Sequence, residues 1–202
     1  AGAATDAEAI PVYPQLVGVN IAGGEFAGSK IPGTVSRDYA YPDVKTIDFF
    51  LASGMNTFRM PFRWERLQRS LGTELDSVEL SRIDAVVGYA TSKGMSVVLD
   101  PHNFASYRGQ KVGSDAVPNA EFASFWAQLA THYGDNDKVI FGLMNEPSGV
   151  SAVSWANSAG RSRRAVRSTP RSTSCKPTMS AFSWLIRSAM RWRSIFLSIP
   201  SP

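Results

Sequence analysis

The sequence has very little cysteine and, toward its end, no acidic residue at all. Its single cysteine, Cys175, excludes an internal disulfide, and with two His it gives no metal-ligand spacing, so no metal site or cofactor is expected. All 17 Asp and Glu residues lie at or before Glu146, so the net charge of +4 averages an acidic body and a basic tail. The charge therefore does not indicate a basic face, and no nucleic-acid partner is expected.

Long apolar runs are also lacking. No stretch approaches the roughly 20 residues that span a bilayer, so no membrane partner is expected. The first residues, "AGAATDAEA", are typical of the segment that follows a signal-peptide cleavage site, which predicts a secreted, extracellular protein. With 202 residues, 44% of them hydrophobic and 19% charged, the chain can bury the core of one domain or at most two.

Four short apolar segments at a steady spacing predict strands, and the stretches after them predict helices. The expected strands are 16–19, 56–60, 96–99 and 139–144. The expected helices are 43–54, 76–94, 119–134 and the beginning of a fourth from 151. Asp43, Asp76 and Asn119 stand where N-caps are needed for the first three helices. The result is a strand–helix rhythm of about 40 residues, which is typical of successive βαβ units in a parallel sheet.

Two architectures fit this rhythm, an open doubly wound sheet and a closed barrel. The stretch "GVNIAGGEFAG" after the first strand does not match the GxGxxG loop of many doubly wound folds. Polar residues lie at or just beyond the C-terminal ends of all four strands, at Asn20, Arg59, His102-Asn103 and Asn145-Glu146. That edge carries the active site of (β/α)8 barrels. We therefore predict an α/β fold of the (β/α)8 TIM-barrel type, with the first four β/α units recognisable.

Taken singly, these polar residues have ordinary structural interpretations. Glu146 before Pro147 is typical of a turn, and a lone histidine such as His102 is more often a satisfied core residue than a functional one. Arg59 lies inside an apolar strand, where a guanidinium needs an anion nearby. Taken together, an adjacent Asn and Glu with Arg and His on neighbouring strand ends favour a sugar-binding cleft.

Longer stretches around these residues resemble a known family. They are "GVNIAGGEF", "NTFRMPFRWERLQ", "VVLDPHNFASYRG" and "VIFGLMNEP". Together they resemble family five of the glycoside hydrolases, and within it the microbial endo-1,4-β-glucanases. The resemblance spans residue 16 to about 150, roughly the first half of such an enzyme. It implies a cellulase that hydrolyses β-1,4-glucan such as cellulose with retention and without a cofactor. A related β-mannanase or β-glucanase remains an alternative.

The resemblance also implies roles for individual residues. Glu146 matches the general acid/base, and Asn145 matches the residue that hydrogen-bonds the 2-hydroxyl of the sugar. Arg59 matches the arginine that keeps the nucleophilic carboxylate ionised and oriented. His102 matches a histidine that lines the cleavage subsite, with Asn103 near it. Further expected cleft residues are Glu25 and Trp64, for which packing is an equal alternative.

The partner carboxylate of Glu146 is missing from this pattern. In the family the nucleophile is a glutamate on the seventh strand, and no strands after the fourth are recognisable in this chain. A second hypothesis is therefore an inactive, truncated half-barrel that binds carbohydrate without cleaving it. An incomplete barrel would also leave its first and fourth strands as open edges, which predicts self-association or aggregation.

The composition changes at about Gly160. Residues 151–202 contain 13 Ser, 8 Arg and no acid. Three interpretations compete: an out-of-frame translation, which the Ser/Arg-rich composition favours; a basic tail that binds nucleic acid or an acidic surface; and a genuine second half. We expect a leader at residues 1–15, half of a glycosidase catalytic domain at 16–159 and an aberrant tail at 160–202.

Overall fold

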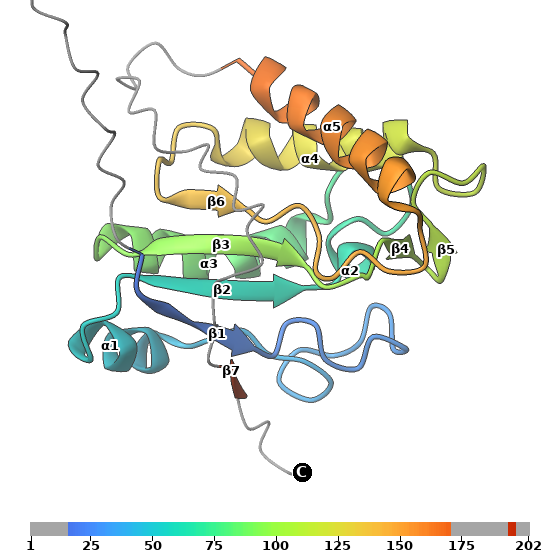
Figure 1. Cartoon of the computed structure of the whole chain (residues 1–202). Helices are drawn as coiled ribbons and strands as arrows, with labels where there is room; N and C mark the ends of the chain where they lie inside the picture. Colours follow the sequence, from blue (N-terminus) through green and yellow to red (C-terminus); the bar gives the residue numbers. More distant parts are fainter. Residues whose placement is uncertain (1–15, 171–193, 197–202) are drawn as a thin grey trace, which may run out of the picture.

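A twisted parallel sheet forms the centre of the protein. The computed structural model describes residues 16–170 and 194–196 of the chain. Its main sheet has five strands in the order β6-β3-β2-β1-β7, and every neighbouring pair is parallel. The strands are β1 Gly18–Ala22, β2 Thr57–Phe62, β3 Ser96–Pro101, β6 Val139–Phe141 and β7 Ser194–Phe196. Figure 1 shows that β1, β2 and β3 point the same way, toward the loops that carry α2 (Trp64–Leu67) and a small antiparallel hairpin. The hairpin consists of β4 Ser106–Tyr107 and β5 Gln110–Lys111.

Four of these strands begin within two residues of the predicted positions, because their apolar runs are covered by protein. Five of the six residues of β2 are buried. β6 ends at Phe141 and not at residue 144 as expected. Its hydrogen bonding to β3 nevertheless continues, since Gly142 N–H donates to Leu99 O at 2.9 Å and Asn145 N–H donates to Pro101 O at 3.0 Å. These bonds hold Asn145 level with the end of β3.

The helices begin where capping chemistry allows. They are α1 Val44–Ala52, α2 Trp64–Leu67, α3 Ser77–Ser92, α4 Asn119–Tyr133 and α5 Ala152–Ser168. Asp43 accepts from Thr46 N–H and Asp76 accepts from Glu79 N–H, which confirms both predicted N-caps. The third was wrong: Pro118 precedes α4, and Asn119 is its first helical residue. Proline is favoured near a helix start because the first N–H groups need no helical partner.

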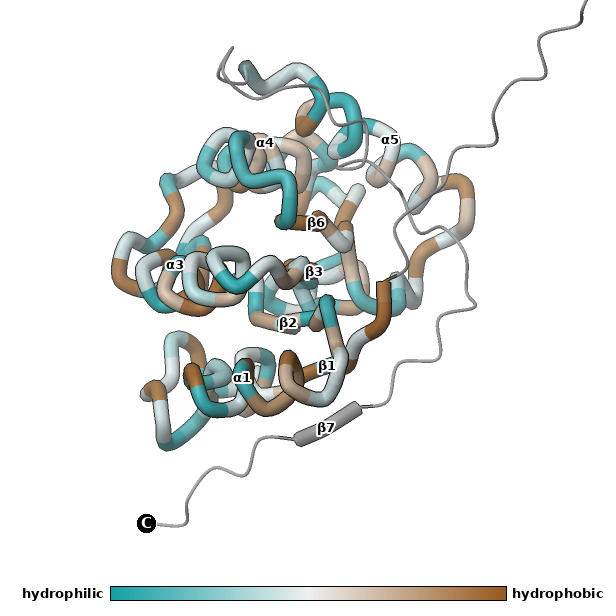
Figure 2. The backbone as a smooth tube through the Cα atoms, turned by 90° about the vertical axis from the view of Figure 1, so that its left-hand side faces the viewer, coloured by the Kyte–Doolittle hydropathy of each residue, from teal (hydrophilic) through white to brown (hydrophobic). Residues whose placement is uncertain are grey.

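Helices α1, α3 and α4 lie along one side of the sheet in chain order, and α5 packs on α4. Figure 2 looks along the strands and shows α1, α3 and α4 on the same side. The core between these layers is rich in aromatic rings. Trp64 lies 5.1 Å from Phe125 and 5.3 Å from Phe122, and Trp126 lies 5.5 Å from Phe141, between ring centroids. Such rings bury more apolar area than any other side chains and so dominate the packing energy.

Two features differ from a simple open half-barrel. β7 pairs with β1, with Asn20 opposite Ser194, so the prediction that the first strand is an open edge was wrong. On the far side of β6, by contrast, no strand pairs with it among the described residues.

Helix α5 runs without a break across the compositional boundary at residue 160, and its Val166 is buried in the core. Among the helices that the structure describes, none is long and apolar enough to cross a membrane.

Candidate active site

Arg59 is the centre of a polar network at the C-terminal ends of the strands. Its side chain leaves β2 between β1 and β3, and one guanidinium nitrogen, Nη1, donates to Asn20 Oδ1 on β1. The other, Nη2, donates to Asp100 Oδ2 on β3 at 2.5 Å and to Asn145 Oδ1 after β6 at 2.7 Å. Arg59 therefore ties four consecutive βα units together through one side chain. Charge-assisted bonds of this length are among the strongest in proteins.

Burial makes this network electrostatically unusual. The Asp100 side chain is only 7% exposed. Burial raises the pKa of Asp100 from 3.8 to about 7, and the neighbouring Glu25 carboxylate raises it further while the Arg59 guanidinium opposes both. Burial also raises the pKa of Glu25, although Gly23 N–H donates to its Oε2 at 2.8 Å. The site thus holds carboxyl groups that are much harder to ionise than exposed ones.

His102 is held as a neutral imidazole. Burial, with the charges of Arg59 and Arg63, lowers its pKa from 6.5 to about 4. Its Nδ1 lies 3.5 Å from Arg59 Nη2, and its Nε2 lies 3.3 Å from Asn145 Nδ2. Both neighbours are donors, so each contact requires an unprotonated ring nitrogen, and a neutral ring can satisfy one of them. A protonated ring would satisfy neither, which agrees with the lowered pKa.

Arg63 links this network to the loop after β1. Its Nε donates to Glu25 O at 3.0 Å, and its Nη1 donates to His102 O at 2.7 Å. Its guanidinium packs directly on Gly28, where a Cβ would lie 2.3 Å from Nη2. Arg63 also lines a cavity of about 470 Å³ beside the network. The residues around this cavity are Gly28, Ser29, Ile31, Arg63, Glu65, Asn103, Phe104, Ser106, Arg108 and Gly109.

Asn103 supports the loop and has little capacity left for a ligand. It is buried, its Oδ1 accepts from Trp64 N–H at 2.9 Å, and its Nδ2 donates to Glu65 Oε2 at 2.7 Å. Trp64 is fully buried, and its indole N–H donates to Gln68 at 2.8 Å. Trp64 is therefore a core residue, and the expectation that it lines a cleft is corrected. Its position just after β2 resembled a cleft position, but helix α2 turns its ring inward.

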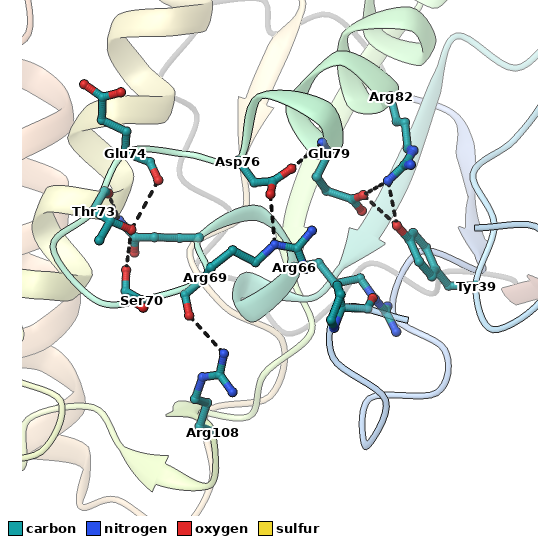
Figure 3. Close-up of polar contacts among 12 residues, drawn as sticks. Tyr39, Arg66, Arg69, Ser70, Thr73, Glu74, Asp76, Glu79, Arg82 and Arg108 are labelled. Carbon is teal, nitrogen blue, oxygen red and sulfur yellow. Dashed lines mark hydrogen bonds and ion pairs between the residues drawn. The ribbon is translucent and has the colours of Figure 1, made fainter. Parts of the chain in front are cut away.

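A buried polar cluster fixes the loop between β1 and α1, as Figure 3 shows. Glu79 on α3 is fully buried and accepts from the Tyr39 hydroxyl at 2.6 Å, the Tyr41 hydroxyl at 2.8 Å and Arg82 Nη1 at 2.6 Å. Arg66 is also fully buried, lies over the Tyr39 ring at 4.0 Å and donates to loop carbonyls. These contacts hold the loop that carries Glu25 against α2 and α3.

Glu146 stands apart from the network in its contacts. Its backbone has φ +35°, a left-handed conformation that is uncommon for a residue other than glycine. Its side chain is exposed, and no hydrogen bond or ion pair joins it to another group in the described part of the chain. Asn145, one residue earlier, belongs to the Arg59 network. The structure therefore brings together Arg59, His102 and Asn145, and leaves the side chain of Glu146, the next residue in the chain, exposed to solvent.

The sequence argument missed Asp100, and it did not use Asn20 as a ligand of Arg59. An aspartate inside the apolar run "VVLDP" is a usable signal, because a buried guanidinium on the next strand needs a carboxylate partner. Arg63 and Glu65 were also missed, since "RWERLQ" reads as an ordinary charged helix start.

A family model and several known proteins match this chain. A family model described as Cellulase (glycosyl hydrolase family 5) matches residues 17–200. The manganese dependent endoglucanase Eg5A of Phanerodontia chrysosporium is 36% identical over 157 residues, which are 76% of this chain and 40% of that protein. The structure of XacCel5A in complex with cellopentaose is 44% identical, with a TM-score of 0.75 over 76% of this chain and 49% of that one. An endo-β-1,4-glucanase from Xanthomonas axonopodis pv. citri is 41% identical, with a TM-score of 0.73 over 74% of this chain and 48% of that one. The chain thus spans about half the length, or less, of these relatives.

Proposed function

Because the chain belongs to the cellulases of glycosyl hydrolase family 5, we propose that it acts in the retaining hydrolysis of β-1,4-glucosidic bonds, as an endo-β-1,4-glucanase. One observation carries this proposal. Arg59 binds Asn145 and Asp100 and lies beside His102 at the sheet edge where (β/α)8 enzymes work, and Glu146 follows Asn145 directly.

In the proposed mechanism Glu146 is the general acid/base. It protonates the glycosidic oxygen as the bond breaks, and later removes a proton from the water that releases the sugar. Asn145 presents its amide to the sugar, because Arg59 already binds its Oδ1 and fixes the orientation of its Nδ2. His102, held neutral by burial and by the nearby guanidinium groups, offers a hydrogen bond without adding charge. The hydrogen bond between Asn145 and the 2-hydroxyl of the sugar is of the kind that strengthens in the transition state.

The nucleophile is left unassigned. Retaining glycosidases hold their two carboxyl groups about 5–5.5 Å apart. Asp100 and Glu25, the two carboxyl groups that interact electrostatically with Arg59, are buried and bound to protein groups, so we assign them to orientation of the network. The family's glutamate would bring the second carboxylate opposite Glu146, where Arg59 would help to keep it ionised.

The proposed substrate is a β-1,4-glucan, for which the cellopentaose complex of XacCel5A is the support. We also propose secretion, since a polysaccharide of this kind lies outside the cell. The name of one relative includes manganese dependence. In residues 16–170 and 194–196, no three His, Cys, Asp or Glu side chains converge on a metal position, and no step of this proposal uses a metal. The domain boundary at residue 160 stays a prediction.

The test compares Glu146→Gln with the unaltered chain on cellopentaose, following products by chromatography and their anomeric form by NMR. General acid/base catalysis contributes about 10²–10⁴-fold, so turnover should fall by at least about 100-fold while binding persists. Glu74→Gln, at an exposed glutamate in the loop before α3, is the matched control and should be unchanged. Equal turnover by Glu146→Gln would overturn the assignment.

The same experiment addresses the alternative of a carbohydrate-binding half-barrel. Binding of cellopentaose by the unaltered chain without any turnover would identify it as the inactive form. Absence of both binding and turnover would refute the glucan proposal for this chain. A preference for mannopentaose over cellopentaose would instead favour a β-mannanase.

A further inference from the structure

The cavity beside the Arg59 network has the features of a separate ligand site. Its volume of about 470 Å³ lies within the range of small-molecule pockets. It adjoins the candidate active site, because Arg63 lines it and donates to His102 O at 2.7 Å. Phe104 also lines it, with its ring centroid 5.0 Å from that of His102. The ring offers an apolar face, and Ser29 and Ser106 add hydroxyl groups.

The charge around this cavity is positive and is not neutralised by ion pairs. Arg63 donates to the carbonyls of Glu25 and His102, and Arg108 donates to Arg69 O at 2.9 Å, a bond drawn in Figure 3. Lys111 lies outside the cavity lining and donates to the carbonyl of the lining residue Phe104 and to Ser148 O. All these acceptors are neutral backbone groups, and no salt bridge involves any of the three cations within the described residues.

The one acidic residue that lines the cavity has its oxygens occupied. Glu65 is buried, and its Oε1 accepts from Arg108 N–H at 2.7 Å while its Oε2 accepts from Asn103 Nδ2 at 2.7 Å. Its carboxylate therefore holds the loop after β3 in place and does not cover the exposed Arg108 head. A ligand carboxylate entering the cavity would meet two guanidinium groups, those of Arg63 and Arg108, that form no salt bridge within the described residues.

The loops that form the cavity are conformationally strained. Among the residues that the structure describes, six other than glycine have positive φ, and four of them belong to these loops: Ala27 at 46°, Phe104 at 52°, Ala105 at 53° and Arg108 at 47°. Such conformations persist only where surrounding contacts impose them, and they concentrate at ligand-binding positions. This strain is independent of the charge argument and points to the same place.

We propose that this cavity binds a carboxylate-bearing sugar unit, a uronate, of a glycan whose neighbouring units occupy the candidate active site. Arg108 and Arg63 recognise the carboxylate, and the planar guanidinium suits it because two N–H groups can face two oxygens. Phe104 packs against the apolar edge of the sugar. The inference rests on the proposed function only in taking the ligand to be a glycan, since binding here requires neither Glu146 nor turnover.

The test uses two disaccharides that differ in one group. One is cellobiose, and the other is 4-O-β-D-glucuronosyl-D-glucose, in which a carboxylate replaces one hydroxymethyl. Calorimetry with the full chain should show the acid binding about tenfold more tightly than cellobiose at low ionic strength, a difference of about 1.4 kcal/mol. The preference should shrink as salt is added, because the site is open to solvent.

Variants locate the effect. Arg108→Gln should remove the preference for the acid, and Arg108→Lys should retain part of it, since Arg108 is exposed and neither change disturbs the core. Arg161→Gln, at an exposed arginine on α5, removes the same charge elsewhere and should leave the preference intact. Equal affinity for both disaccharides, undetectable binding of the acid, or an unchanged preference in Arg108→Gln would each overturn the proposal. If the unaltered chain prefers the acid but does not hydrolyse cellopentaose, the proposed function is refuted and the uronate site stands.

Discussion

Asp100 provides the sharpest test of the electrostatics of this site. Its pKa rises from 3.8 in an exposed chain to about 7 in the folded protein, chiefly through burial. A carboxyl group whose folded pKa is raised favours folding when protonated, so its contribution is full below pH 4 and is lost as pH rises toward 7. The difference of about 3 in pKa corresponds to about 4 kcal/mol of unfolding free energy, at about 1.36 kcal/mol for each pKa unit.

The perturbation is Asp100→Asn, which keeps the shape of the side chain and removes its titration. Urea unfolding followed by tryptophan fluorescence would measure the free energy of unfolding of both proteins from pH 3 to pH 8. Losing the partner of Arg59 destabilises the variant by an amount that does not vary with pH, because arginine stays charged throughout. The difference between the two proteins should therefore change by about 4 kcal/mol across this range, with the unaltered chain losing relative stability as pH rises.

Asp115→Asn, at an exposed aspartate, is the matched control. Its free energy of unfolding, plotted against pH, should run parallel to that of the unaltered chain. Parallel curves for Asp100→Asn would refute the reasoning. They would mean that the 2.5 Å contact with Arg59 offsets the cost of burial, so that the pKa of Asp100 is the same in the folded and the unfolded chain. A difference of the opposite sign, with stability gained as pH rises, would refute it more strongly.

Three further predictions follow from contacts already described. The His102 ring should titrate near pH 4 when followed by NMR, and a midpoint near 6.5 would contradict its burial. Because its folded pKa is lowered, the contribution of His102 to the free energy of unfolding should be lost as pH falls from about 6.5 toward 4. Gly28→Ala should destabilise the chain by about 1–3 kcal/mol, because a Cβ would lie 2.3 Å from Arg63 Nη2. Gly88→Ala, where nothing lies within 4 Å on α3, should instead stabilise by about 0.5–1 kcal/mol, and equal effects in thermal melts would refute the contact. Glu79→Ala should lower the free energy of unfolding in urea by about 3–5 kcal/mol, because it leaves Arg82 and two tyrosine hydroxyls without their acceptor. A loss below about 1 kcal/mol would show that the cluster contributes little to stability.

The parallel sheet was predictable from the sequence because strand length and helix length together set a period of about 40 residues. The capping aspartates were also predictable, because an N-cap depends on only four neighbouring residues. The end of β6 was not, since the glycine and leucine after Phe141 are as apolar as the strand itself. There the ladder hydrogen bonds continue while the strand conformation does not.

Within the site, Arg59 and Asn145 were found because polar residues at strand ends stand out against apolar runs. Asp100 escaped notice because Asp before Pro resembles a turn, and only the register of β3 against β2 shows that it faces the guanidinium. Trp64 was misplaced for a related reason. Sequence position predicts the edge of the sheet at which a residue lies, whereas the four-residue helix α2 decides whether the ring faces the core.

The pairing of β7 with β1 has a consequence for the order in which this chain can fold. β1 meets β2 through residues 39 apart, such as Gly18 and Thr57, whereas Asn20 meets Ser194 across most of the chain. Contacts of long sequence separation carry the larger loop-closure entropy and form late. On a ribosome, the first three strands emerge long before residues 194–196 are made. During that part of synthesis, the backbone groups of β1 that later pair with β7 have no strand partner. That interval is when a nascent chain needs protection by chaperones.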